Sequence, residues 1–240
     1  ADPNTTEQIG EAYGFSLVYS GNFLSQIEVD TYNVTRASMG INPYHFAWDL
    51  QPGTSFQTPE VVMAYSKDGL NGMSQQFHNV YREHLLHNQT PFKKAPVLIN
   101  SWEANYFDFD DAKILEQAQL AKDLGFDLFV LDDGWFGSRD SDNGSLGNWT
   151  SDLRKIPQGI ADLSEKIQAM GIHCGLWFEP EMLSVDTPLF KAHPNWIIGN
   201  PDKNISHGRN QFVLDFSNPD VVDNIFEQMS EVLSTSNIDY

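Results

Sequence analysis

The sequence predicts an α/β protein in which a β-rich first part is followed by the beginning of a (β/α)8 barrel. Residues 14–66 are strand-like, and from Val97 onward short apolar strands alternate with amphipathic helices, a pattern typical of a parallel sheet. No Gly-rich phosphate loop follows these strands, which argues against a doubly wound nucleotide-binding sheet. Polar and aromatic residues follow each strand instead, where barrel enzymes have their active sites.

The first part reads as strands separated by turns and followed by a helix. The strand-like runs are GFSLVYSGNF, SQIEVDTYNVT and EVVMAYS. Pro52 and Pro59 predict loop or edge structure before the last run, because proline cannot donate to a central ladder. Apolar residues at intervals of three or four predict a helix over residues 69–86. Residues 89–96 predict a linker, so we expect one domain at 1–88 and a second at 89–240.

The second part begins with a strand, a helix and another strand. VLINSW predicts a short strand that ends at Trp102. Asp108 or Asp110 is placed to cap the next helix, and Gly125 stands where a helix C-cap belongs. FDLFVLDD then predicts the second strand, in which the apolar run from Leu128 to Leu131 precedes two final carboxylates.

Two more helices and a third strand complete the predicted second part. Apolar residues from Ile160 to Met170 are spaced as on one helix face, and Gly171 closes that helix. HCGLWFEPEM predicts the third strand; Asn218 and Pro219 then predict the N-cap and first residue of the last helix, and NIDY begins another strand. Such a segment forms roughly half of a barrel, which typically needs about 250 residues.

The composition restricts the partners. The chain has 33 acidic and 14 basic residues and a formal net charge of −19, which disfavours nucleic acid and anionic membranes as partners. No run of 18 apolar residues occurs, so we expect no membrane span. Asn-x-Ser/Thr sequons are more frequent than chance and slightly favour secretion over a cytoplasmic location; they begin at Asn4, Asn33, Asn88, Asn143, Asn148 and Asn204.

Asp132 and Asp133 directly follow the second strand, where a buried strand could not hold two adjacent charges. Carboxylates accept strong hydrogen bonds from hydroxyls, and tryptophan offers an apolar ring to the C–H face of a sugar. Adjacent strand residues point to opposite faces, so both carboxylates reach one ligand only if the chain turns, which Gly134 permits. Their adjacency also argues against a catalytic acid and nucleophile pair. Tryptophans at strand ends complete a pattern suited to a sugar: Trp102, Trp135 and Trp177.

Each of these residues also has an ordinary structural interpretation. An isolated Asp-Asp-Gly is more often a turn than a site, and Trp102 and Trp177 taken singly are equally consistent with core positions. Glu179 and Glu181 flank Pro180 and could form a solvated loop face as readily as a binding site. Arg209 on generic grounds is a structural ion-pair partner. The placement beside several tryptophans at a strand end favours the site for the paired aspartates.

A metal site and a reactive thiol are both disfavoured. A metal would recruit Asp132, Glu179 and either His173 or His207, but no metal-ligand spacing connects them. Cys174 is the only cysteine, so the chain forms no internal disulfide and no cysteine metal cluster. Its position within a strand indicates a small core residue rather than a nucleophile.

Five motifs carry a resemblance to a known family: NSWEANYFDFD, GFDLFVLDDGWFG, GNWTSDLRKIPQGI, GIHCGLWFEPEM and GRNQFVLDFSNPDV. In this order they resemble the α-galactosidases of glycoside hydrolase family 36, and the bacterial and fungal tetrameric type is most similar. SGNFLSQIEVD and MGINPYHFAWDLQPGTSFQTPE resemble the end of that family's N-terminal β-sandwich domain. The resemblance covers nearly the whole chain. It implies the first part of a (β/α)8 TIM barrel preceded by the end of a β-sandwich domain.

The resemblance implies retaining hydrolysis of terminal α-1,6-linked galactose from melibiose, raffinose or stachyose. It implies no metal and no cofactor, and a homo-oligomeric, tetrameric protein. The residue matching Trp102 borders the sugar pocket, and those matching Asp132 and Asp133 hold galactose hydroxyls. The residues matching Trp177 and Arg209 line the same pocket. On this resemblance the paired aspartates carry specificity and not bond cleavage.

The resemblance implies that the catalytic carboxylates lie outside this chain. The family's nucleophile belongs to a Lys-Trp-Asp motif at the end of the fourth barrel strand, whereas this chain ends at Tyr240 near the start of that strand. We therefore expect a fragment that is inactive alone, with FVLDF in the loop after the third strand. A non-catalytic galactose-binding remnant stays open, as does an α-N-acetylgalactosaminidase or a galactosyl transferase of the same superfamily.

Overall fold

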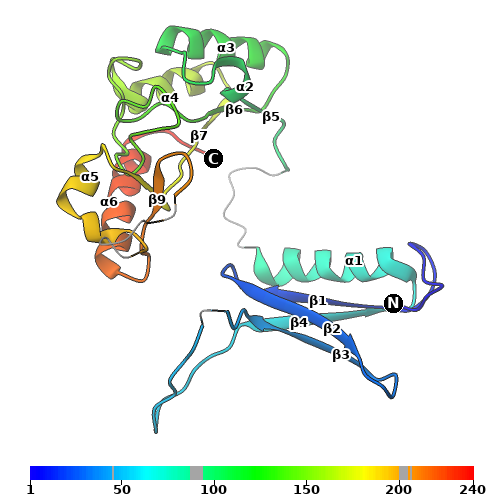
Figure 1. Cartoon of the computed structure of the whole chain (residues 1–240). Helices are drawn as coiled ribbons and strands as arrows, with labels where there is room; N and C mark the ends of the chain where they lie inside the picture. The colour runs from blue at the N-terminus through cyan, green and yellow to red at the C-terminus, as the bar shows by residue number, and fades with distance from the viewer. Residues whose placement is uncertain (45, 87–93, 200–204, 206) are drawn as a thin grey trace. The chain divides into compact units, whose positions relative to one another are not determined.

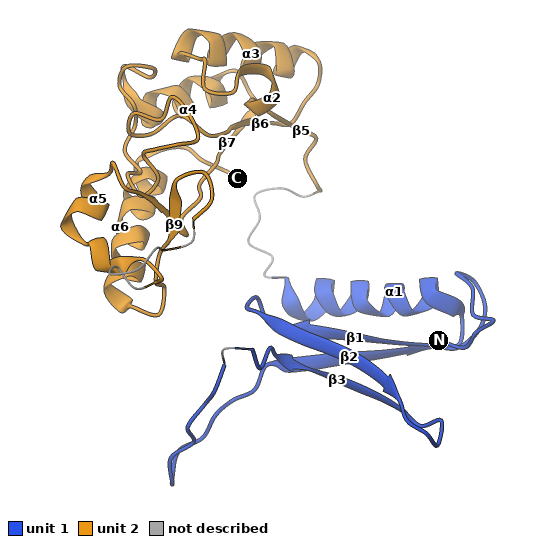
Figure 2. Ribbon diagram, viewed as in Figure 1, with its two compact units in different colours: residues 1–90 blue, residues 91–240 orange. Residues whose placement is uncertain are grey.

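The computed structural model describes residues 1–44, 46–86, 94–199, 205 and 207–240. The chain forms two compact units, Ala1–Thr90 and Pro91–Tyr240 (Figure 2). Most of the linker predicted at 89–96 lies outside the described residues, as do the sequon asparagines Asn88 and Asn204. Each unit is described by itself below.

The first unit contains two antiparallel strand pairs and one long helix (Figure 1). Its elements are β1 (Ala12–Val18), β2 (Phe23–Val29), β3 (Thr35–Ile41), β4 (Glu60–Ser66), α1 (Gly69–Val80) and the π-helical turn η1 (Tyr81–Leu85). β1 pairs with β4, and β2 pairs with β3. α1 packs closely on β1, since a Cβ at Gly14 would lie 2.6 Å from Sδ of Met73. This unit is the strand-rich end of an N-terminal β-sandwich.

The second unit is built on a three-stranded parallel sheet in the order β5-β6-β7. Its strands are β5 (Leu98–Asn100), β6 (Leu128–Leu131) and β7 (His173–Leu176). Helix α3 (Asp111–Asp123) connects β5 to β6, and α4 (Gly159–Ala169) connects β6 to β7. This alternation of parallel strands and helices is the beginning of a (β/α)8 barrel.

The last residues continue this sheet beside β7. The backbone N–H of Asp239 donates to the Cys174 carbonyl at 2.8 Å, and that of Leu176 donates to the Tyr240 carbonyl at 2.9 Å. These bonds follow α6 (Pro219–Thr235). The strand predicted at NIDY therefore begins next to the third strand, as expected for a barrel.

Three predicted helix ends in the second unit are confirmed by their caps. Asp110, and not Asp108, caps α3 by accepting from the backbone N–H of Lys113 at 2.9 Å. Gly125 follows this helix with a positive φ of 86°, a conformation that glycine adopts without strain. Asn218 accepts from the N–H of Asp220 at 3.0 Å and caps α6.

Several predicted strand ends are wrong. The runs predicted for β1 and β2 extend past Val18 and Val29, β3 was not predicted, and β6 stops at Leu131 instead of reaching Asp133. β5 stops at Asn100, and Trp102 begins a short helix, α2 (Trp102–Asn105), because the Asn100 side chain accepts the Trp102 N–H at 2.8 Å and turns the chain. β7 stops at Leu176, and the rest of the predicted third strand leads into β8 (Met182–Ser184).

The stretch after β7 forms an excursion of its own. β8 pairs antiparallel with β9 (Gln211–Val213), and α5 (Pro188–Ala192) and a 3-10 turn η2 (Pro194–Trp196) lie between them in sequence. β9 is therefore not a strand of the three-stranded parallel sheet. The expectation that FVLDF belongs to the loop after the third strand is confirmed.

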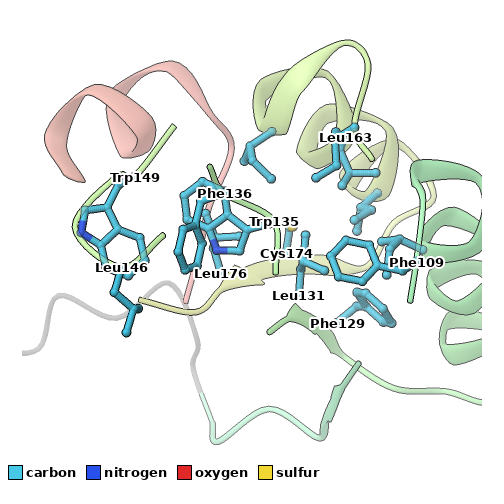
Figure 3. Close-up of a cluster of buried hydrophobic side chains, with 14 of the residues drawn as sticks. Phe109, Phe129, Leu131, Trp135, Phe136, Leu146, Trp149, Leu163, Cys174 and Leu176 are labelled. Carbon is cyan, nitrogen blue, oxygen red and sulfur yellow. The ribbon is translucent and has the colours of Figure 1, made fainter. Parts of the chain in front are cut away.

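The core of the second unit lies between the sheet and its helices and extends past the strand ends. Phe129 and Leu131 of β6 and Cys174 of β7 are buried with the inner faces of α3 and α4. Beyond the strands, Trp135 and Phe136 are fully buried and continue the same cluster (Figure 3). The chain that follows β6 is thus packed as firmly as the strand itself, which gives the site a rigid base.

Candidate functional site

The carboxyl ends of β5, β6 and β7 meet at one edge of the sheet. In the register of the sheet, Asn100 pairs with Val130 and Val130 with Gly175. The residues that follow each strand therefore lie next to one another, and they carry the predicted carboxylates and tryptophans. In open parallel sheets and in barrels this edge is where ligands bind.

Asp132 is held by two side chains at and just after the end of β5. Its backbone N–H donates to Oγ of Ser101 at 3.1 Å, and its Oδ2 accepts from Nδ2 of Asn100 at 2.6 Å. Its Oδ1 accepts the backbone N–H of Asp133 at 2.8 Å. The half-buried carboxylate therefore has a fixed direction, and each of its oxygens keeps a further lone pair.

Asp133 points to a different partner. Its side chain is buried, and both of its oxygens accept from Arg139, Oδ1 from Nε at 2.7 Å and Oδ2 from Nη2 at 2.8 Å. Directly after the two aspartates, the chain turns sharply at Gly134, which has a φ of 100°. A Cβ at Gly134 would lie 3.1 Å from the ring of Phe109, so the turn is also tightly enclosed.

Of the three tryptophans that the sequence singled out, Trp102 and Trp177 lie half-buried at neighbouring strand ends. The prediction was wrong for Trp135, which is fully buried in the core and offers no ring face to a ligand. Trp102 makes edge-to-face contacts with Tyr106 and Phe107 at centroid distances of 5.2 and 5.1 Å. Trp177 donates its backbone N–H to the Leu131 carbonyl at 3.0 Å, and its own carbonyl accepts from Nε1 of Trp135 at 2.9 Å. Both rings are therefore oriented by packing while part of each stays open to solvent.

Arg209 approaches this group through Glu179. It occupies a two-residue turn in which Arg209 and Asn210 have φ of 48° and 56°, and Nδ2 of Asn210 donates to Oδ1 of Asn143 at 2.9 Å. Nη2 of Arg209 lies 3.7 Å from Oε1 of Glu179. Burial raises the pKa of Glu179, and the nearby Arg209 offsets part of that rise.

The predicted residues thus lie on the segments that follow β5, β6 and β7, and Arg209 reaches them from the excursion after β7. The sequence did not single out Asn100, Ser101 or Arg139, although they fix the two aspartates. Asn100 had a detectable signal, since it is a polar residue at the end of an apolar strand. Arg139 had none, because its partner depends on how the loop after β6 folds.

Neither a metal centre nor a membrane-spanning helix emerges from the described residues. Across the described parts of the chain, His, Cys, Asp and Glu form no group of three that could hold a metal ion. In those same parts, no helix has both the length and the apolar character needed to cross a membrane. The segments at the strand ends offer carboxylate oxygens, the guanidinium of Arg209 and aromatic faces, which together suit a neutral polyhydroxylated ligand.

Family models match nearly the whole chain. The Melibiase model matches residues 55–240, and the model of the glycosyl hydrolase family 36 N-terminal domain matches residues 1–51. Among curated proteins, α-galactosidase AgaA of Geobacillus stearothermophilus is 53% identical over 99% of this chain, and α-galactosidase Mel36A of Lactobacillus acidophilus is 46% identical over 100%. The chain spans only 32% and 33% of the lengths of these two relatives.

Solved structures of α-galactosidases superpose closely on this chain. The crystal structure of AgaA from Geobacillus stearothermophilus gives a TM-score of 0.94 at 53% identity and covers 98% of this chain and 33% of that one. The α-galactosidase from Lactobacillus brevis gives a TM-score of 0.96 at 50% identity over 100% of this chain and 32% of that one. Variants of AgaA have been crystallised with raffinose and with stachyose. The chain therefore belongs to the melibiase family, within glycoside hydrolase family 36.

Proposed function

We propose that the whole protein is an α-galactosidase that removes terminal α-1,6-linked galactose with retention of configuration, and that this chain supplies much of its galactose-binding surface. One observation carries the proposal. Two carboxylates and two half-exposed tryptophans occupy neighbouring strand ends in a chain that is 53% identical to an α-galactosidase over 99% of its length. Raffinose and stachyose, crystallised with AgaA variants, both end in such a galactose.

Each residue has a role in this proposal. Asp132 and Asp133 accept hydrogen bonds from galactose hydroxyls, using the lone pairs that Asn100 and Arg139 leave free. Trp102 and Trp177 border the pocket with their rings, against the C–H face of the sugar. Arg209 lines the outer part of the pocket. The axial O4 of galactose distinguishes it from glucose, and acceptors in fixed directions discriminate strongly between such epimers.

Bond cleavage is assigned to other residues. A retaining glycosidase needs two carboxyl groups about 5 Å apart on opposite sides of the scissile bond. Asp132 and Asp133 are adjacent in the chain, and each is already engaged by a neighbouring side chain. We therefore propose that the nucleophile and the acid/base are not among the residues of this chain, which spans about a third of its relatives' length.

The test is the kinetics of the full-length gene product on nitrophenyl α-galactoside and α-glucoside. The expected result is cleavage of the galactoside alone, with the α-anomer of galactose as the first product in proton NMR. Asp132→Ala should lower kcat/KM by about 100-fold, because a fixed acceptor is lost at the sugar. Asp123→Ala, at an exposed carboxylate on α3, is the control and should stay near the parent value. Equal cleavage of both substrates, or a fully active Asp132→Ala, would overturn the proposal.

We also propose that the whole protein is a homo-oligomer, a tetramer as in the family type that the motifs resemble. Light scattering of the full-length gene product after size exclusion tests this directly. A mass of four chains is the expected result, and a monomeric mass would contradict it.

A further inference from the structure

Arg139 is the most deeply enclosed charged residue near the candidate site. Its exposed fraction is 1%, and its guanidinium donates through Nε and Nη2 to Asp133 and through Nη1 to the Gly144 carbonyl at 2.6 Å. Its charged carbon also lies 5.7 and 5.8 Å from the ring centres of Phe107 and Phe136. Every part of this side chain is therefore fixed by a neighbour.

A second buried cation holds the loop that carries Arg139. Nζ of Lys155 donates to the backbone carbonyls of Phe107, Gly134 and Arg139 at 3.0, 3.1 and 2.8 Å. The carbonyls of Gly134 and Arg139 belong to the loop after β6, and that of Phe107 belongs to the segment between α2 and α3. Lys155 thus fixes the backbone at Gly134 and at Arg139, the residue from which the guanidinium extends to Asp133.

Stability alone does not account for this arrangement. Removing two charges from water costs several kcal/mol per ion, and replacing a buried ion pair by apolar residues of similar volume is often neutral or stabilising. A guanidinium can donate to both oxygens of a carboxylate and so fix the plane of that group, which a lysine ammonium cannot do. The carboxylate fixed here is that of Asp133, next to Asp132 at the strand end.

We infer that Arg139 is a positioning residue for Asp133: its guanidinium sets the direction of the free Asp133 lone pairs toward a galactose hydroxyl, without itself contacting the sugar. The inference rests on the proposed function. It assigns part of the discrimination between sugars to Arg139, a residue of the loop after β6 that lies six positions beyond Asp133. It also explains why both oxygens of a predicted substrate-binding carboxylate are occupied by a protein side chain.

The test is a double-mutant cycle in the full-length gene product, read as kcat/KM for nitrophenyl α-galactoside. The variants are Asp133→Asn, Arg139→Lys and the double variant, and circular dichroism checks that each is folded. Arg139→Lys should lower kcat/KM by about tenfold or more, because one ammonium cannot hold both oxygens. In the double variant the loss should equal that of Asp133→Asn within about twofold, because Arg139 acts only through Asp133.

Arg154 provides the matched control. It lies in the same connection between β6 and α4, its side chain is 57% exposed, and it pairs with Asp140 and Asp152 rather than with Asp133. Arg154→Lys should therefore leave kcat/KM near the parent value. If Arg139→Lys does not fold, Asp133→Asn is compared with Asp133→Asn/Arg139→Met, in which both charges are removed. Equal kcat/KM supports the inference, and a further loss contradicts it.

The remaining outcomes separate the inference from the proposed function. A folded Arg139→Lys with parental kcat/KM overturns the inference alone. Losses that multiply in the double variant do the same, since they would mean that Arg139 acts independently of Asp133. A fully active Asp133→Asn, or a parent that does not cleave α-galactosides, overturns the assigned role of Asp133 or the proposed function, and the inference with it.

Discussion

At the scale of single residues, two adjacent aspartates acquire different surroundings. Asp132 is oriented by Asn100 and Ser101, at and just after the end of the neighbouring strand, whereas Asp133 is buried against Arg139 from its own loop. The sequence predicted that the chain must turn between them and that Gly134 would allow it. The hydrogen-bond partners of the two aspartates could not be predicted, because they depend on the fold of the loop and on the register of the strands.

Glu179 provides a test of the electrostatics of the site. Burial raises its pKa above the usual value of 4.5, so the folded state favours the protonated form. Glu179 therefore contributes its full stabilising free energy below the pKa that it has in the unfolded chain. That contribution is lost as the pH rises through the higher pKa of the folded protein. Relative to Glu179→Gln, the parent should lose free energy of unfolding over that window in urea titrations at a series of pH values. A parent that gains stability there would contradict this.

Cys174 should be chemically inert while the protein is folded. Burial raises the pKa of its thiol to about 12, and the nearby Asp239 adds to the rise, so almost no thiolate exists near neutral pH. Iodoacetamide at about pH 8 should leave the native protein unmodified in mass spectrometry and should alkylate it in denaturant. Rapid alkylation of the native protein would show that the strand carrying Cys174 opens readily.

At the scale of elements, helix ends were more predictable than strand ends. Helix ends depend on local caps such as Asp110 and Asn218, which the sequence displays directly. Strand ends depend on where a partner strand stops and on turns such as the one that Asn100 makes with the Trp102 N–H. The β8–β9 pair was not foreseen for the same reason, because its two strands are far apart in the sequence.

The cap of α3 gives a prediction at this scale. Asp110→Ala removes the side-chain acceptor of the Lys113 N–H and should lower the free energy of unfolding of the second unit by about 1 kcal/mol. Asp110→Ser keeps a capping oxygen and should lower the free energy of unfolding by only roughly a few tenths of a kcal/mol. Urea denaturation of the three proteins measures the difference, and equal midpoints for both variants would refute the role of the cap.

At the scale of the whole molecule, the first unit leaves apolar strand surface uncovered. Phe23, Ile27 and Val29 of β2 are 55%, 69% and 63% exposed. Exposed edge strands with apolar side chains promote association. The 240-residue chain expressed alone should therefore self-associate and bind the dye ANS, and Ile27→Lys with Val29→Lys should reduce both. A monodisperse monomer that does not bind ANS would contradict this.

The architecture follows from the sequence at this scale because strand and helix patterns recur along the chain. The alternation after Val97 predicted the parallel sheet, and the side chains after each strand predicted the edge at which the candidate site lies. The net charge of −19 follows directly from the sequence, since it does not depend on how the chain folds. The conformation of the loop after β6 could not be predicted, because the contacts of Arg139 and Lys155 that stabilise it follow no periodic pattern in the sequence.

The most direct test of the account is a crystal structure of the full-length gene product with galactose. The account predicts the sugar at the carboxyl edge of β5, β6 and β7, with hydroxyl oxygens about 2.6–3.0 Å from Asp132 and Asp133 and its C–H face on a tryptophan ring. Arg139 should still hold both oxygens of Asp133. Galactose bound elsewhere, with this edge empty, would contradict the central claim.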